Sequence, residues 1–117
     1  MRVTLLFIAI VALHATNACA QEGGVRIKAG FITGNQYRGY ANVLQRRYVM
    51  GVVDGLFLAP IFDVPKERLA WLENCVVGKT DDQVTTIVNQ YLNKNRVRWR
   101  EPMHVLVYAG LRDACPK

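Results

Sequence analysis

The sequence is poor in the residues from which catalytic and metal centres are usually built. Of its 117 residues only three are cysteine and two are histidine, and nine acids face fifteen lysines and arginines. It contains neither a glycine-rich phosphate loop after a strand nor a histidine pair at metal-binding spacing. Beyond the N-terminal apolar run, no segment approaches the ~20 apolar residues that a membrane span needs. We therefore expect no enzyme activity, no metal or cofactor, and no membrane insertion.

The first 20 residues have the pattern of a secretory signal peptide. Arg2 precedes an apolar run of eleven residues, and residues 18–20 (ACA) form a small-x-small cleavage site. Cleavage after Ala20 would leave 97 residues and lower the net charge from +6 to +5, because only Arg2 is charged in the removed part. We expect an exported, periplasmic protein. A retained signal anchor and lipidation at Cys19 are the alternatives.

The mature chain would keep two cysteines, Cys75 and Cys115, and one histidine, His104. In an oxidising compartment such a pair is typical of a disulfide. A catalytic thiolate would need a nearby base, and a metal site would need three or four ligands. These two possibilities, and free thiols, are the alternatives to the bridge. A Cys75–Cys115 bridge would close a loop of about 40 residues and contribute about 4 kcal/mol in the chain-entropy model.

Apolar residues at spacings of three and four predict an all-α fold with four helices and no alternating strand pattern. A single helical domain over residues 31–117 would follow a loose lead at residues 21–30. The expected helices cover about residues 34–58, 66–74, 81–94 and 102–115. The disulfide would join the ends of the second and fourth helices.

The first three of these helices have specific start signals. Thr33 with Gln36, and Thr80 with Gln83 before the third helix, match the capping-box pattern. Pro65 suits the first position of the second helix. The first helix would present one apolar face, made of Tyr37, Tyr40, Leu44, Tyr48, Val52 and Leu56, opposite Arg38, Asn42, Gln45 and Arg46.

Three glycines, Gly39, Gly51 and Gly55, lie inside the first predicted helix and each costs about 1 kcal/mol relative to alanine. Their spacing suggests that another backbone packs close by. A helix weakened or broken near Gly51 is the alternative interpretation.

Few acidic residues lie at positions that suggest a catalytic or metal-binding role. Asp54 lies within the apolar run MGVVDGLFLAPIF, where a buried carboxylate would need a partner or a functional reason. We expect it to pair with an arginine or cap a turn. Asp81 and Asp82 suit the positive end of a helix dipole better than an acid pair for catalysis or metal binding.

The positive charge is concentrated around one tryptophan. Arg96, Arg98 and Arg100 bracket Trp99 between the third and fourth predicted helices. Arginine and tryptophan are enriched at binding hot spots, so these four residues are the candidate partner-binding surface. A solvated basic loop with Trp99 in the core is the alternative. Nucleic acid is not expected as the partner of an exported protein.

Several motifs together resemble the Rap/Tai family, the secreted immunity proteins of type VI secretion systems. The resemblance covers about residues 31–116. It rests on Phe31-x-Thr33-Gly34-Asn35-x-Tyr37, Tyr48-x-x-Gly51-x-x-Asp54-Gly55, Cys75-x-x-Gly78-x-Thr80-x-x-Gln83, Tyr91-Leu92, Arg100-Glu101-Pro102 and the C-terminal cysteine.

The resemblance implies a small helical periplasmic protein that often forms a homodimer and has structural disulfide bonding. It also implies a non-enzymatic immunity protein that occludes a peptidoglycan amidase effector. A small periplasmic stress protein or chaperone with one disulfide is the alternative function. An enzyme that uses Asp54 or His104 is the third and least favoured interpretation.

Overall fold

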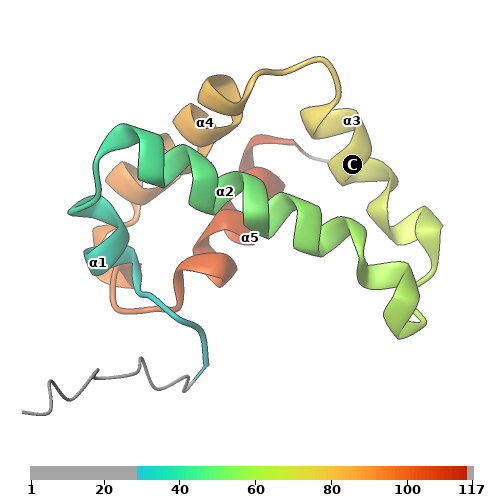
Figure 1. Cartoon of the computed structure of the whole chain (residues 1–117), viewed down its shortest axis with the longest axis horizontal. Helices are drawn as coiled ribbons and strands as arrows, with labels where there is room; N and C mark the ends of the chain where they lie inside the picture. The colour runs from blue at the N-terminus through green and yellow to red at the C-terminus, as the bar shows by residue number, and fades with distance from the viewer. Residues whose placement is uncertain (1–28, 116–117) are drawn as a thin grey trace, which may run out of the picture.

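Helices make up the regular structure of residues 29–115, the part of the chain that the computed structural model describes (Figure 1). The α-helices are α1 (Gly34–Arg38), α2 (Asn42–Phe57), α3 (Ala70–Val76), α4 (Asp81–Lys94) and α5 (Met103–Ala114). Short 3-10 helices lie between them: η1 (Ala59–Phe62), η2 (Lys66–Leu69) and η3 (Arg96–Arg98). The predicted all-α fold is confirmed. The predicted signal peptide, and all but the last two residues of the lead, fall outside the described residues.

Both predicted capping boxes start helices. At α1, Thr33 Oγ1 accepts the Gln36 amide at 3.4 Å, and Gln36 Oε1 accepts the Thr33 amide at 2.8 Å. At α4 the corresponding distances between Thr80 and Gln83 are 3.2 and 2.9 Å. Each pair satisfies two amides that have no partner within the helix, which explains why the chain enters a helix at these points.

The predicted continuous helix over residues 34–58 is wrong, because the chain breaks between α1 and α2. The Gly39 and Tyr40 amides close α1 by donating to the Gln36 and Tyr37 carbonyls, respectively, and Ala41 is extended at φ −60°, ψ 149°. Backbone hydrogen bonds hold α1 separately: the Asn35 amide donates to the Trp99 carbonyl at 2.8 Å. The alternative break near Gly51 is also wrong, since α2 runs through that residue.

The break shifts the helical phase, so the predicted apolar face of α2 is wrong in part. Tyr40 and Leu44 are exposed, whereas Gln45, Val49 and Val53 point into the core. Because α2 begins at Asn42, it buries a different face from the one expected of a continuous helix that begins at Gly34.

Gln45 is buried because it completes a polar network that joins three helices. Its Nε2 donates to the Tyr37 carbonyl at 3.1 Å, and its Oε1 accepts from Asn89 Nδ2 at 3.1 Å. The Tyr37 hydroxyl donates to Asn89 Oδ1 at 3.0 Å, and burial raises the pKa of that hydroxyl. Each polar atom used here has a partner, which lowers the cost of burying it.

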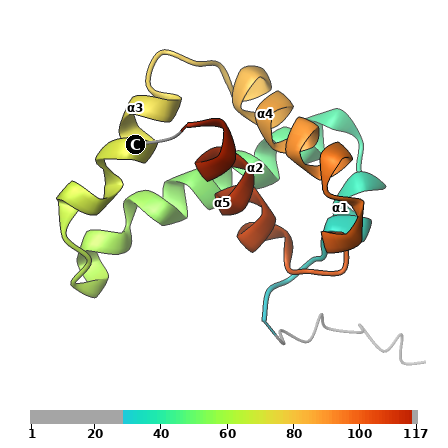
Figure 2. The ribbon, with the colours of Figure 1, turned by 180° about the vertical axis from the view of Figure 1, so that it is seen from behind.

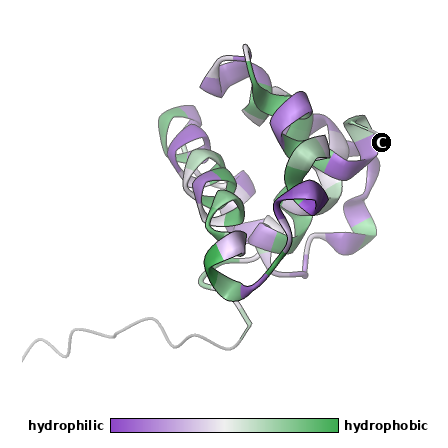
Figure 3. Cartoon of the chain, turned by 90° about the vertical axis from the view of Figure 1, so that its right-hand side faces the viewer, coloured by the Kyte–Doolittle hydropathy of each residue, from purple (hydrophilic) through white to green (hydrophobic). Residues whose placement is uncertain are grey.

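Helix α5 lies in the middle of the fold and contacts α1, α2, α3 and α4 (Figures 1 and 2). Leu106, Val107 and Leu111 of α5 are fully buried against core residues of α2 and α4. Hydrophobic and hydrophilic segments alternate along the helices (Figure 3), as expected when each helix buries one face.

The predicted disulfide joins the end of α3 to the end of α5. Cys75 and Cys115 are bonded, and their Cα atoms are 5.5 Å apart. The second predicted helix divides into η2 and α3, with Pro65 as the residue before η2. The bridge therefore fixes the short α3 helix, which has only Leu72 and Cys75 fully in the core, to the central helix.

Candidate binding surfaces

Trp99, the centre of the predicted surface, is partly built into the fold. Its indole Nε1–H donates to the Leu92 carbonyl at 2.8 Å. The guanidinium carbon of Arg38 lies 3.4 Å from the ring centroid, and that of Arg96 lies 5.9 Å away. The indole is half-buried. Through its contacts with Arg38 of α1 and Leu92 of α4, Trp99 joins α1 to the end of α4.

Arg98 is occupied by contacts within the fold. It forms a two-pronged pair with Glu101, with Nε–Oε1 at 2.7 Å and Nη2–Oε2 at 2.6 Å, and its Nη1 donates to the Tyr91 hydroxyl. The pair raises the pKa of the Arg98 guanidinium and lowers the pKa of the Glu101 carboxyl. An arginine held this way stabilises the conformation of its own segment whether or not a partner is bound.

The structure thus divides the four predicted partner-binding residues. Arg96 and Arg100 are exposed, whereas Arg98 and Trp99 are half-buried and hydrogen-bonded inside the fold. Beside them Val97 is 93% exposed. The most exposed part of this surface consists of Arg96, Val97 and Arg100.

A second surface, which the sequence interpretation missed, lies where α2 ends and η1 begins. We call Phe57, Leu58, Ile61 and Phe62 the apolar tip. Ile61 and Phe62 are 73% and 76% exposed, and none of the residues of η1 is buried. The end of α2 and η1 project from the body of the fold, at the lower right of Figure 1. The sequence feature that could have predicted this surface is the run LFLAPIF at residues 56–62, because it has more large apolar residues than a turn at Pro60 requires.

The structure corrects one expectation about the acids and explains another. Asp54 is exposed on α2, so the expected burial and pairing are wrong, and it makes no side-chain hydrogen bond within residues 29–115. Asp81 and Asp82 lie at the start of α4 and face Arg46, at 3.7 and 3.5 Å. These ion pairs connect α2 to α4, in keeping with the structural interpretation of the two acids.

The described part, residues 29–115, has no group of three or more histidine, cysteine or acidic side chains arranged to hold a metal ion. None of its helices has both the length and the apolar character that crossing a membrane requires.

Comparisons with known proteins found no relative of this chain. The chain matches no family model, no curated protein and no solved structure. The resemblance to the Rap/Tai family therefore rests on the sequence motifs alone. Of these, Thr33–Gln36 and Thr80–Gln83 act as helix caps, and Cys75 bonds to Cys115.

Proposed function

We propose that this chain is an exported, non-enzymatic binding protein that inhibits a peptidoglycan amidase delivered by a type VI secretion system. The class of partner comes from the family resemblance. The observation that supports binding is the apolar tip, because large exposed apolar side chains that project together commonly mark protein-binding surfaces. Periplasmic export is part of the proposal, and the Cys75–Cys115 disulfide suits an oxidising compartment.

Inhibition would follow from occlusion and would need no chemistry in this chain. The tip would enter the substrate groove of the amidase, bury Ile61 and Phe62, and exclude the peptidoglycan strand. Burying a large apolar side chain contributes about 1.5–3 kcal/mol, so two such residues supply a substantial part of a tight complex. The exposed arginines Arg96 and Arg100 form a second contact region for an acidic partner surface.

The test begins with a partner search. The oxidised mature chain, residues 21–117, serves as bait in an extract of the native organism, and bound proteins are identified by mass spectrometry. A stoichiometric wall hydrolase is then purified, and its release of peptidoglycan fragments is measured with and without this protein. We expect equimolar inhibition by the wild type.

Paired variants separate the two candidate surfaces. Ile61→Asp with Phe62→Asp should weaken inhibition by on the order of 100-fold or more, because two central contacts would be lost. Val77→Asp is the matched control, since Val77 is also apolar and 70% exposed but lies after α3. Arg96→Ala with Arg100→Ala tests the basic surface; it removes the distant Arg96 contact with Trp99 but leaves the Arg98–Glu101 pair, the Arg38 stack and the Trp99–Leu92 hydrogen bond in place.

Three outcomes would contradict the proposal. A hydrolase that binds without losing activity would refute occlusion. Equal loss of inhibition in the Val77→Asp variant and in the tip variant would show that the tip is not part of the interface. Suppression of aggregation of many unrelated proteins at low pH, with no stoichiometric partner, would favour the alternative of a small periplasmic chaperone, for which the exposed tip would serve as a client surface.

A further inference from the structure

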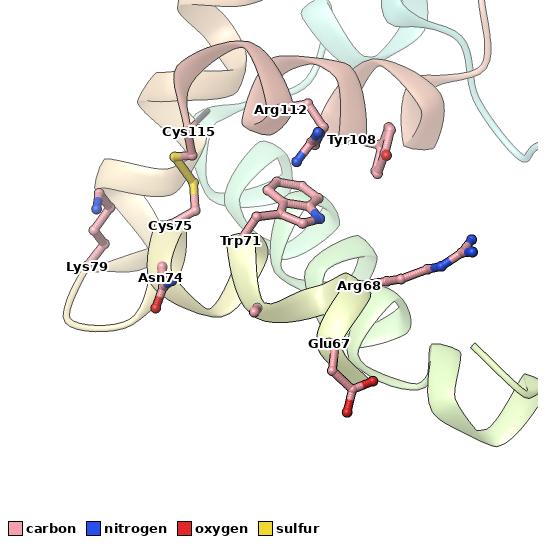
Figure 4. Close-up of a pocket in the computed structure, with 10 residues that line it drawn as sticks. Glu67, Arg68, Trp71, Asn74, Cys75, Lys79, Tyr108, Arg112 and Cys115 are labelled. Atoms are coloured by element: carbon pink, nitrogen blue, oxygen red, sulfur yellow. A yellow bond between two sulfur atoms is a disulfide. The ribbon is translucent and has the colours of Figure 1, made fainter. Parts of the chain in front are cut away.

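A cleft of about 990 Å³ lies between α3 and α5, beside the disulfide (Figure 4). Trp71 of α3 and Tyr108 and Arg112 of α5 line its wall, and Lys79 stands on the other side of the disulfide from Trp71. Because the bond between Cys75 and Cys115 joins the two helices at this point, the cleft has fixed walls. None of the apolar tip residues lines it, so it is independent of the surface proposed above.

The charge of the cleft is unbalanced toward positive. Its lining contains Arg68, Lys79 and Arg112 against one acid, Glu67. Among the described residues none of these three cations lies within 4.0 Å of a carboxylate oxygen, whereas Arg46 and Arg98 both have such partners. Arg112 is half-buried, whereas Arg68 and Lys79 are exposed, so Arg112 is the cation whose lack of a counter-charge most favours an anionic ligand.

Arg112 is held in a defined orientation at this wall. Its guanidinium carbon lies 4.5 Å from the centroid of the Trp71 ring, and that ring meets Tyr108 edge to face at 5.6 Å and 88°. Within the described residues, Arg112 Nη1 is shielded from solvent and has no hydrogen-bond acceptor. This nitrogen is closed to a ligand and fixes no partner of its own. The other guanidinium nitrogens of Arg112 are not shielded in this way and make no hydrogen bond within the described residues, so they are the donors that an anionic oxygen in the cleft would meet.

We propose that this cleft binds the carboxylate of a peptide, with Arg112 as the main anion contact and Trp71 and Tyr108 as the surface for the adjoining apolar side chain. The fork of N–H groups on an arginine matches a carboxylate, and stacking on Trp71 leaves the in-plane N–H groups for it. A phosphate dianion is usually met by several converging cations. Here Arg112 and Lys79 lie on opposite sides of the disulfide (Figure 4), which suits a singly charged group attached to an apolar chain.

The two tryptophans give an internal comparison for the test. The oxidised mature chain is labelled with ¹⁵N and titrated with N-acetyl-Ala-Ala-Phe bearing a free carboxylate, and separately with its C-terminal amide. We expect the indole N–H signal of Trp71 to shift with the acid and stay in place with the amide. The Trp99 indole, hydrogen-bonded to Leu92 and remote in sequence, should not shift with either.

Substitution then identifies the anion contact. Arg112→Gln should weaken binding of the acid by at least about tenfold, the loss of one charge-assisted hydrogen bond. Arg47→Gln removes the same charge from an exposed position outside the cleft and outside the proposed partner-binding surfaces, and should change the affinity less than about twofold.

Several results would overturn the proposal. These are an equal response to acid and amide, a shift at Trp99 in place of Trp71, an unchanged affinity in Arg112→Gln, or inorganic phosphate binding as tightly as the peptide acid. The comparison of acid with amide uses the unmodified protein, so it decides the matter even if Arg112→Gln fails to fold.

Discussion

Arg38 and Trp99 are stacked, with the guanidinium carbon 3.4 Å from the centre of the indole. Arg38 belongs to α1 and Trp99 to the segment between α4 and α5, so the contact joins parts of the chain about 60 residues apart in sequence. The Asn35 amide adds a hydrogen bond to the Trp99 carbonyl at 2.8 Å. A residue that looked like a binding hot spot therefore stabilises the position of the short α1 helix.

Replacement of Trp99 by alanine should reduce the free energy of unfolding by about 2–4 kcal/mol, through lost burial, the lost Leu92 hydrogen bond and the lost stack. Arg38→Ala should cost about 1 kcal/mol. Arg100→Ala is the control and should change the stability by less than about 0.5 kcal/mol. Urea unfolding followed by circular dichroism measures all three. A Trp99→Ala variant of unchanged stability that no longer binds a partner would return Trp99 to the binding surface.

The disulfide should make one of the largest single contributions to stability. A bridge between residues 40 apart in sequence contributes about 4 kcal/mol in the chain-entropy model. The double variant Cys75→Ser with Cys115→Ser should therefore unfold at much lower urea concentration than the oxidised protein. Wild type treated with a reductant should behave alike. If reduction leaves the midpoint unchanged, the two cysteines are not bonded in solution.

The polar network in the core gives a third prediction. Asn89→Ala would leave the Tyr37 hydroxyl and the side-chain oxygen of Gln45 without their partner, and each orphaned buried group costs about 1–3 kcal/mol. Asn93→Ala on the exposed side of the same helix is the matched control. Comparison of their unfolding midpoints tests the network, and similar midpoints for the two variants would argue against it.

Local rules predicted those elements whose signals lie within a few residues. The boxes at Thr33 and Thr80 fixed the starts of α1 and α4, and the clean apolar spacing after Thr80 predicted α4 over its whole length. The long-range features were not predictable in this way. Gln45 appeared to belong to a polar face, and its burial depends on Tyr37 and Asn89, which no local pattern connects. The exposure of Ile61 likewise depends on long-range packing, because no other segment of residues 29–115 covers it.

The ion pair of Arg98 and Glu101 should make stability depend on pH in the acid range. The pKa of the Glu101 carboxyl is lowered from its ordinary value near 4.5, so the folded state binds the proton more weakly than the unfolded state does. Its stabilisation is complete above that value and is lost as the pH falls through the lowered pKa. Because the pair is partly exposed, we expect only about 0.5–1 kcal/mol. Urea unfolding between pH 6 and pH 2 should show a smaller acid loss in Glu101→Gln than in wild type.

The glycines of α2 offer a test of which faces are covered. A Cβ built at Gly51 or Gly55 meets nothing within 4 Å, so the expected close approach of another backbone is wrong within the described chain. Alanine at either position should therefore raise the free energy of unfolding by about 0.5–1 kcal/mol, the difference in helix propensity. At Gly34 the same Cβ would lie 2.8 Å from Leu106 Cδ1 and 3.1 Å from the Trp99 carbonyl oxygen, so Gly34→Ala should destabilise. Loss of stability in Gly51→Ala, dependent on protein concentration, would instead mean that this face of α2 packs against a second copy of the chain.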